Sequence, residues 1–198
     1  MSNKVAIIAP IYDAFPEIVS SMMCQTHTNW ELLLIDDNPT STRTRDIVTT
    51  VNDSRIKYIA RPRIDAALFG HPHRQWALQE MKVGKLAPDA NHVLITNADN
   101  YYLPNYLAAM VVPFQNPNVA ASYCAAMIHS YIAWKTMPCR LALGHVDCGG
   151  VLVRKSVACD IGWKSFEHSS DWTYFADILA KHPAHKWAKV ENILFVHN

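Results

Sequence analysis

The feature that most limits the fold of this sequence is a repeat of short apolar runs, each of which stops at a polar turn. These runs cover residues 5–9, 31–35, 56–59 and 93–95, and they are apolar apart from Glu31 and Lys57. Continuous apolar runs of strand length, bounded by turn residues, are typical of buried parallel strands. Apolar residues at helical spacing lie between them, at 15–24, 42–51 and 74–83. The alternation predicts an α/β domain with a mostly parallel, doubly wound central sheet flanked by helices.

The second half of the chain is less regular. Helical spacing resumes over residues 103–114 and again over 171–180. Apolar, β-branched runs predict strands at 120–127 and 151–153, and two short terminal strands at 189–190 and 193–196. The pattern over 130–143 does not distinguish a strand from a helix. The length of 198 residues suits one domain with a sizeable core.

Composition excludes several classes of protein. The formal net charge of +1 gives no electrostatic reason to expect a nucleic-acid partner. The five cysteines are odd in number and lack C-x-x-C spacing, which favours buried free thiols over a disulfide framework. No charged-then-apolar leader opens the chain, and no apolar run approaches the roughly 20 residues of a transmembrane segment. We expect a soluble, cytoplasmic protein.

Acidic residues follow three of the predicted strands. Asp13 follows the first, Asp36 and Asp37 follow the second, and Asp99 follows the run at 93–95. Loops at the carboxyl ends of parallel strands share one face of a domain, so these carboxylates can converge on a ligand. Any single aspartate is as easily a turn or helix-cap residue. The glycine-rich fingerprints of dinucleotide-binding and P-loop folds are absent.

Several segments carry a family resemblance, and they occur in the family's order along the chain. They are the stretch 5–38 with its Asp36-Asp37-Asn38 turn, Arg74-Gln75-x-Ala77-Leu78, 97–104, 148–155, and Ser170-Asp171-Trp172. Together they resemble family 2 glycosyltransferases of the GT-A fold. The Asp-Asp-Asn turn is similar to that of the bacterial spore-coat polysaccharide glycosyltransferase type.

The resemblance implies a single GT-A domain over residues 1–198, with a nucleotide-binding half (1–103) and an acceptor and catalytic half (104–198). It implies transfer of a sugar from a nucleotide-diphosphate sugar, with a UDP-sugar favoured, to the hydroxyl of an unknown glycan, lipid or protein acceptor. The reaction would be metal-dependent and inverting. Two alternatives stay open: a nucleotidyltransferase that makes an activated sugar, and a non-catalytic module that binds nucleotide sugars or glycans. The first usually has a glycine-rich loop after the first strand, and residues 10–15 contain no glycine.

The nucleotide site implied by the resemblance begins after the first strand. Pro10 and Tyr12 would contact the base, with Tyr12 stacked on it, unless the tyrosine packs in the core. Asp37 would accept a hydrogen bond from the N3–H of a pyrimidine. Asp13 stands where the family usually has asparagine, and either contacts the nucleotide or caps the following helix. Arg74 would lie near the diphosphate, because a guanidinium fork suits phosphate oxygens, unless it is a solvated helix-start residue.

The metal site implied by the resemblance centres on Asp99. Carboxylate and phosphate oxygens suit Mn²⁺ or Mg²⁺, and His197 matches a late histidine of the family that completes the coordination. Asn97 and Ala98 belong to the same segment. Ala98 replaces the usual first acid, so a single carboxylate remains there. This loss keeps the binding-module alternative open.

The reaction centre implied by the resemblance lies in the second half. Asp171 would be the general base that takes the proton of the acceptor hydroxyl, although an aspartate in the first turn of a helix is also favoured by the helix dipole. Asp147 would bind hydroxyls of the donor sugar. Gly149 and Gly150 would let the backbone approach that sugar closely.

Overall fold

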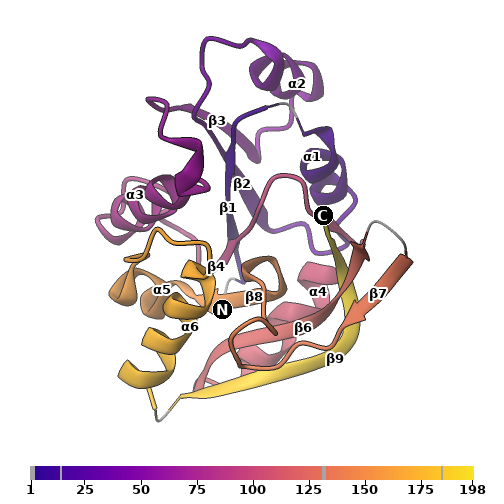
Figure 1. Ribbon diagram of the computed structural model, residues 1–198, viewed down its shortest axis with the longest axis vertical. Helices are drawn as coiled ribbons and strands as arrows, with labels where there is room; N and C mark the ends of the chain where they lie inside the picture. The colour runs from indigo at the N-terminus through magenta and orange to yellow at the C-terminus, as the bar shows by residue number, and fades with distance from the viewer. Residues whose placement is uncertain (1–2, 14, 131–132, 184) are drawn as a thin grey trace.

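The computed structural model describes residues 3–13, 15–130, 133–183 and 185–198. Over this part of the chain the strands form one nine-stranded sheet in the order β3-β2-β1-β4-β8-β6-β9-β5, with β7 paired to β6. Figure 1 shows α3, α5 and α6 together at the left of the molecule, and α1 and α2 at its upper right. No helix among the described residues is long and apolar enough to cross a membrane.

The first half of the chain has the predicted alternation of strands and helices. β1 pairs in parallel with both β2 and β4, so that Ile7 lies opposite Leu32 on one side and Leu94 on the other. The elements are β1 (Val5–Ile11), α1 (Pro16–Met23), β2 (Trp30–Asp36), α2 (Arg43–Val51), β3 (Ile56–Ala60), α3 (His71–Lys82) and β4 (His92–Ile95).

The second half departs from the predicted parallel sheet. β8 pairs antiparallel with β4 and with β6, and only the pairing of β6 with β9 is parallel there. The elements are β5 (Tyr101–Tyr102), α4 (Tyr106–Val111), β6 (Val119–Ser130), β7 (Ala133–Met137), β8 (Val151–Arg154), α5 (Lys155–Ile161), α6 (Ser170–Lys181) and β9 (Lys186–His197). The sheet is therefore parallel at the β3-β2-β1-β4 end and largely antiparallel beyond it.

Several predicted bounds are corrected by tertiary contacts. The helix expected from residue 103 begins at Tyr106, because the N–H of Leu103 donates to the carbonyl of Leu194 in β9. The helix expected from residue 74 begins at His71, with a proline in its first turn. The two short terminal strands are one long strand, β9, whose register with β6 shifts near Cys124. Helix α5 was not predicted.

Side chains alternate between two apolar layers on the two faces of the sheet. In β1, Ala6 and Ile8 pack with the helices α3, α5 and α6, whereas Ile7 packs with α1 and α4. Because both faces are covered, the central strands are continuously apolar. The cysteines are free thiols; four of them are buried as predicted, and Cys24 is exposed.

Candidate functional site

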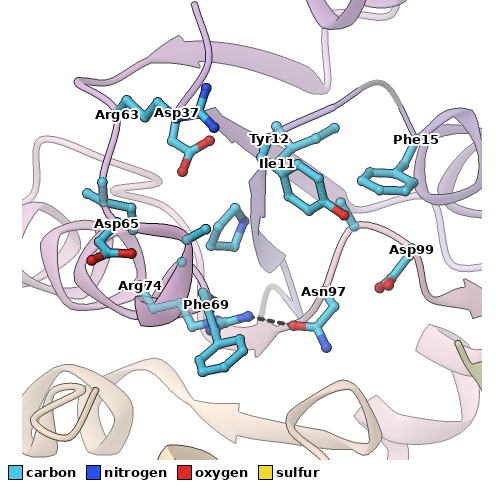
Figure 2. Close-up of a pocket in the computed structure, with 15 residues that line it drawn as sticks. Ile11, Tyr12, Phe15, Asp37, Arg63, Asp65, Phe69, Arg74, Asn97 and Asp99 are labelled. Atoms are coloured by element: carbon cyan, nitrogen blue, oxygen red, sulfur yellow. Dashed lines mark hydrogen bonds between the residues drawn. The ribbon is translucent and has the colours of Figure 1, made fainter. Parts of the chain in front are cut away.

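A cleft of about 500 Å³ opens at the carboxyl ends of β1, β2 and β4. This is the edge of an open α/β sheet at which ligands are expected. Figure 2 shows its lining residues. The predicted site residues in the lining are Pro10, Tyr12, Asp37, Arg74, Asn97, Ala98 and Asp99. The lining also includes Ile11, Phe15, Arg63, Ile64, Asp65, Ala66, Phe69 and Gly70.

The two adjacent aspartates after β2 have different surroundings. The Asp36 side chain is buried and accepts hydrogen bonds from the N–H of Asn38 at 2.9 Å and from the hydroxyl of Tyr58 at 3.0 Å. Asp37 faces the cleft, and its buried Oδ1 has no hydrogen-bond partner. Burial raises the pKa of Asp37, the charge of nearby Arg63 lowers it, and that of Asp36 raises it. Asp36 is thus structural, and Asp37 keeps a free acceptor atom.

Tyr12 lies at the opening of the cleft and does not pack in the core. Its side chain is 65% exposed. The ring meets Phe15 edge-on, with the ring centroids 5.5 Å apart, and this contact fixes its orientation beside the cleft. An exposed ring held in this way presents a flat apolar surface to a ligand.

Asp13 lies outside the cleft lining. Its Oδ1 accepts a hydrogen bond from Arg43 Nη1 at 2.8 Å, and both side chains are exposed. The N-cap residue of α1 is Phe15, and no side chain caps that helix. The structure therefore joins Asp13 to α2 through this ion pair.

Arg74 lies beneath the cleft, and the solvated alternative does not hold because the residue is only 3% exposed. Its Nη1 donates to the carbonyl oxygen of Phe69 at 2.8 Å and lies 2.6 Å from His71 Nδ1. Its Nη2 donates to Asn97 Oδ1 at 2.5 Å. The guanidinium thus joins the loop before α3 to the loop after β4, and its buried Nε has no hydrogen-bond partner.

The other basic groups before and in α3 have separate surroundings. The Arg61 guanidinium stacks on Trp76, 4.2 Å from the ring centroid, whereas Arg63 lines the cleft. Burial and neighbouring arginine charge lower the pKa of His71 to about 4 and also lower that of His73. Both imidazoles are therefore neutral at physiological pH and add no positive charge for a phosphate.

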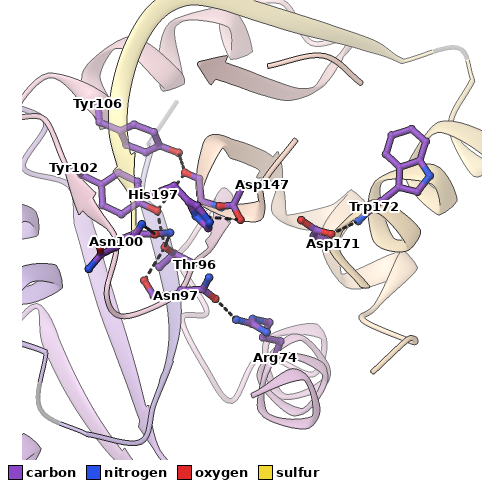
Figure 3. A network of polar contacts seen from close by, with 12 residues as sticks. Arg74, Thr96, Asn97, Asn100, Tyr102, Tyr106, Asp147, Asp171, Trp172 and His197 are labelled. Carbon is purple, nitrogen blue, oxygen red and sulfur yellow. Dashed lines mark hydrogen bonds and ion pairs between the residues drawn. The ribbon is translucent and has the colours of Figure 1, made fainter. Parts of the chain in front are cut away.

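A buried network holds the loop that carries Asp99. The Thr96 hydroxyl accepts a hydrogen bond from Asn100 Nδ2 at 3.1 Å and lies 2.6 Å from the Tyr102 hydroxyl. The Tyr106 hydroxyl donates to the carbonyl oxygen of Gly149 at 2.8 Å. Figure 3 shows this network between the loop after β4 and the turn before β8. Tyr102 and Tyr106 were not among the predicted site residues. The pattern that could have indicated them is a pair of tyrosines four residues apart, directly after the acidic turn.

Ala98 lies where the resemblance expects an acid. The residue is 4% exposed and packs in the apolar layer that contains α1 and α4, while it also lines the cleft. The methyl group therefore continues the core up to the floor of the cleft. This position supplies no carboxylate to a ligand.

Asp99, Asp147 and His197 are close enough for their charges to interact. His197 is fixed in β9 opposite Ile128, and its Nδ1 lies 3.5 Å from Asp147 Oδ2. Burial and the Asp147 charge raise the pKa of Asp99, which the charges of His197 and Arg74 lower. Within the part of the chain that the structure describes, the buried Oδ1 of Asp99 and Nδ1 of His197 have no hydrogen-bond partner.

These atoms define how a metal ion could be held. Over the described ranges, no three or more His, Cys, Asp or Glu side chains are grouped so that they could hold a metal ion. Asp99 and His197 therefore fit a divalent cation only if substrate oxygens supply further ligands. The unpartnered Asp99 Oδ1 suits such a cation, which prefers carboxylate and phosphate oxygens.

Gly149 and Gly150 lie in the buried 3-10 turn Cys148–Gly150, which Asp147 caps by accepting the Gly149 N–H at 2.8 Å. A Cβ atom on Gly149 would lie 2.6 Å from Asn100 Nδ2, and one on Gly150 would lie 2.9 Å from the Phe195 ring. Close packing within the protein therefore accounts for both glycines. Neither residue lines the cleft.

Asp171 lies in the first turn of α6, close enough to Asp147 and Arg74 for their charges to act on it, and outside the cleft lining. Its Oδ1 accepts the N–H of Trp172 at 2.7 Å. The pKa of Asp171 is raised to about 6: burial and the Asp147 charge raise it, and the hydrogen bond from Trp172 and the charges of Arg74 and His168 lower it. A carboxylate with such a pKa can act as a proton acceptor near neutral pH.

Comparisons with known proteins identify relatives for part of the chain. No family model matches it. Over 131 residues, 62% of this chain and 29% of the relative, it is 29% identical to Protein CgeD of Bacillus subtilis. Over 58 residues, 28% of this chain and 22% of the relative, it is 47% identical to the Escherichia coli UDP-Glc:alpha-D-GlcNAc-diphosphoundecaprenol beta-1,3-glucosyltransferase WfgD. The chain thus spans less than a third of the length of these relatives.

The fold resembles solved structures over nearly all of this chain. The S. aureus TarS fragment 1-349 in complex with UDP-GlcNAc superposes with a TM-score of 0.73 at 13% sequence identity. The match covers 98% of this chain and 58% of the TarS chain. At this identity the likeness shows a shared fold. Part of the sequence is therefore similar to a named glycosyltransferase, and the fold is the one that TarS has.

Proposed function

We propose that this protein is a glycosyltransferase that uses a nucleotide-diphosphate sugar, with a UDP-sugar as donor. The observation that carries the proposal is one cleft with two buried carboxylate oxygens that have no hydrogen-bond partner, on Asp37 and on Asp99. A buried acceptor without a partner costs free energy, which a ligand can recover. A uracil N–H suits the first oxygen and a diphosphate-bound cation suits the second. TarS, which has the same fold, has been solved in complex with UDP-GlcNAc, and this supports a UDP-sugar as the donor.

The base would bind at the Asp37 end. A carboxylate is an acceptor only, so Asp37 Oδ1 favours the imide N3–H of uracil over cytosine, whose N3 carries no proton. Tyr12 would stack on the base, and Pro10 would line its pocket. Arg63, whose charge already acts on Asp37, would limit the repulsion between this carboxylate and the phosphates.

A divalent cation, Mn²⁺ or Mg²⁺, would be held by Asp99 and His197 together with diphosphate oxygens. When bound, such an ion neutralises the negative charge that develops on a departing nucleotide. Arg74 would hold Asn97, and with it the loop of Asp99, in place through the hydrogen bond between their side chains. Because Arg74 is buried, its charge also offsets the mutual repulsion of Asp99, Asp147 and Asp171.

Asp171 would be the general base of an inverting transfer. Its carboxylate takes the proton of the acceptor hydroxyl, whose oxygen forms the new bond to the anomeric carbon. The bond from that carbon to the diphosphate oxygen breaks, and UDP leaves with the electron pair. Asp147, between Asp171 and His197, would contact the hydroxyls of the donor sugar. The acceptor would be a glycan, lipid or protein hydroxyl.

The test is a search for nucleoside diphosphate release. Purified protein is incubated with Mn²⁺ and a panel of nucleotide sugars, and free UDP, GDP and pyrophosphate are measured separately. UDP released from a UDP-sugar, and lost in Asp99→Ala, supports the proposal. Pyrophosphate formation or consumption would indicate a nucleotidyltransferase instead. Tight donor binding without turnover on any acceptor would indicate a binding module.

A further inference from the structure

Phe69 has an unusual backbone conformation for a bulky residue. It directly follows the 3-10 turn Ala66–Leu68 and has a φ of 49°, in the left-handed region. Glycine is the usual residue after such a turn, because a side chain is strained there. Residues held in this region cluster at ligand sites, where the surrounding structure imposes the conformation. The turn alone therefore does not explain why a phenylalanine occupies this position.

The surroundings fix the Phe69 backbone on both sides. Its N–H donates to the carbonyl of Ala66 at 3.1 Å, and its own carbonyl accepts from the buried Arg74 at 2.8 Å. The next residue, Gly70, also has a positive φ, and a Cβ atom there would lie 2.8 Å from Cβ of Pro10. The position of the Phe69 ring is thus set by contacts that reach into the floor of the cleft.

The ring itself is largely uncovered. The Phe69 side chain is 53% exposed and lines the cleft. It meets His168 edge-on, with the centroids 5.6 Å apart and an interplanar angle of 88°, and lies 5.9 Å from the His71 ring. The imidazoles hold the ring in place, so a fixed apolar surface faces the cleft at no further cost in side-chain entropy.

Phe69 is linked through its neighbours to both parts of the proposed reaction centre. Arg74 links the Phe69 carbonyl to Asn97, two residues before Asp99, and Figure 2 draws the Phe69 ring beside that pair. On its other side the ring contacts His168, whose charge acts on Asp171. The proposed function puts the diphosphate at Asp99 and the attacked carbon within reach of Asp171. The donor's sugar ring must lie between them.

We propose that Phe69 is the platform on which the apolar face of the donor sugar stacks. The inference rests on the proposed function. A hexopyranose has one face of C–H groups that packs well against a flat aromatic ring, and its hydroxyls point outward to polar groups such as Asp147. An aromatic contact of this kind is expected to change affinity roughly three- to tenfold.

The test compares UDP with UDP-GlcNAc and UDP-glucose by calorimetry in the presence of Mn²⁺. In Phe69→Leu, which removes the flat ring, both UDP-sugars should bind roughly three- to tenfold more weakly, while UDP should bind within about twofold of wild type. Phe69→Tyr should restore the UDP-sugar affinity. Tyr12→Leu is the matched control, because loss of an aromatic ring from the base site should weaken UDP and UDP-sugars equally.

Phe69→Gly separates this role from a structural one. Glycine relieves the strain at φ 49°, so its thermal unfolding should stay close to that of wild type or rise, while the UDP-sugar affinity falls as in Phe69→Leu. Equal loss of UDP and UDP-sugar affinity in Phe69→Leu, or unchanged affinity for both, would overturn the inference. A wild-type protein that binds neither UDP nor the UDP-sugars would instead refute the proposed function, and the inference with it.

Discussion

The two ends of the cleft are assembled in different ways. The base end takes Pro10, Tyr12 and Asp37 from the carboxyl ends of two adjacent parallel strands, less than 30 residues apart. The proposed reaction end takes its groups from four separate segments of the chain, at Asp99, which lines the cleft, and at Asp147, Asp171 and His197, which lie outside its lining. The base end therefore depends on local β-α geometry, whereas the reaction end exists only when the antiparallel half has closed against β4. Substitutions should thus separate binding from turnover.

The largest effect is expected at Asp171. Asp171→Asn should lower turnover by about 10²–10⁴-fold, because an amide cannot take the acceptor proton, while the affinity for UDP stays within about twofold. Since the pKa of Asp171 is about 6, wild-type turnover should fall as the pH drops below 6, where the carboxylate becomes protonated. Steady-state kinetics from pH 5 to 8 with UDP titrations check both points. Retained activity in Asp171→Asn would contradict the role.

The second-largest loss of turnover is expected on substitution of Asp99, and it should come from loss of metal binding. Asp99→Asn should lower turnover by roughly 100-fold, because a cation's charge stabilisation is worth several kcal/mol. Mn²⁺ should tighten UDP binding to the wild-type protein and no longer do so in the variant. Titration of UDP with Mn²⁺ and with EDTA measures the difference directly. Equal UDP affinity of the wild-type protein in Mn²⁺ and EDTA would show that these residues hold no functional cation.

Asp37 should affect binding and leave the chemical step unchanged. Asp37→Asn should weaken UDP roughly 10- to 100-fold, because it removes a hydrogen bond to a charged acceptor. At saturating donor, turnover should remain close to wild type. Asp36→Asn is not a matched control, because Asp36 is buried and holds Tyr58. A kcat that falls while the UDP affinity is kept would break the separation of the two ends.

Asp171 also predicts a pH-dependent change in stability. Its pKa is raised on folding from 3.8 to about 6, so the folded state binds the proton more tightly, and ionisation destabilises the fold as pH rises through that window. Asp171→Asn should therefore increase the free energy of unfolding by about 1–3 kcal/mol at pH 8. The difference should vanish below pH 4. Denaturant unfolding at pH 8 and at a pH below 4 tests this, and a variant less stable than the wild-type protein at pH 8 would contradict it.

The smallest effect is expected at Asp13. Its ion pair with Arg43 is exposed and lies outside the cleft lining, so Asp13→Asn should change stability by less than about 1 kcal/mol. UDP affinity should stay within about twofold of wild type. The same UDP titrations check this. A loss comparable to that of Asp37→Asn would show that the base end extends to the Asp13 loop.

Much of the base end could be predicted because its signals are local. An apolar run followed by a polar turn places both Tyr12 and Asp37 at one sheet edge. The family resemblance singled out Asp37, and the alternation of side chains along a strand accounts for the difference, because Asp36 points into the protein while Asp37 faces the cleft. The sequence analysis missed Phe69, since an exposed aromatic residue in a loop carries no periodic signal, and its positive φ depends on Arg74 and Ala66.

By itself, the sequence determined the alternation of strands and helices in the first half and the carboxyl-end edge at which the cleft lies. It also indicated the chemistry of individual groups such as Asp99. Only the tertiary structure decided that β8 runs antiparallel beside β4, and that His197 lies next to Asp147. The physical reason is range: apolar periodicity reports a residue's own element, whereas pairing and burial depend on contacts between segments far apart in the chain.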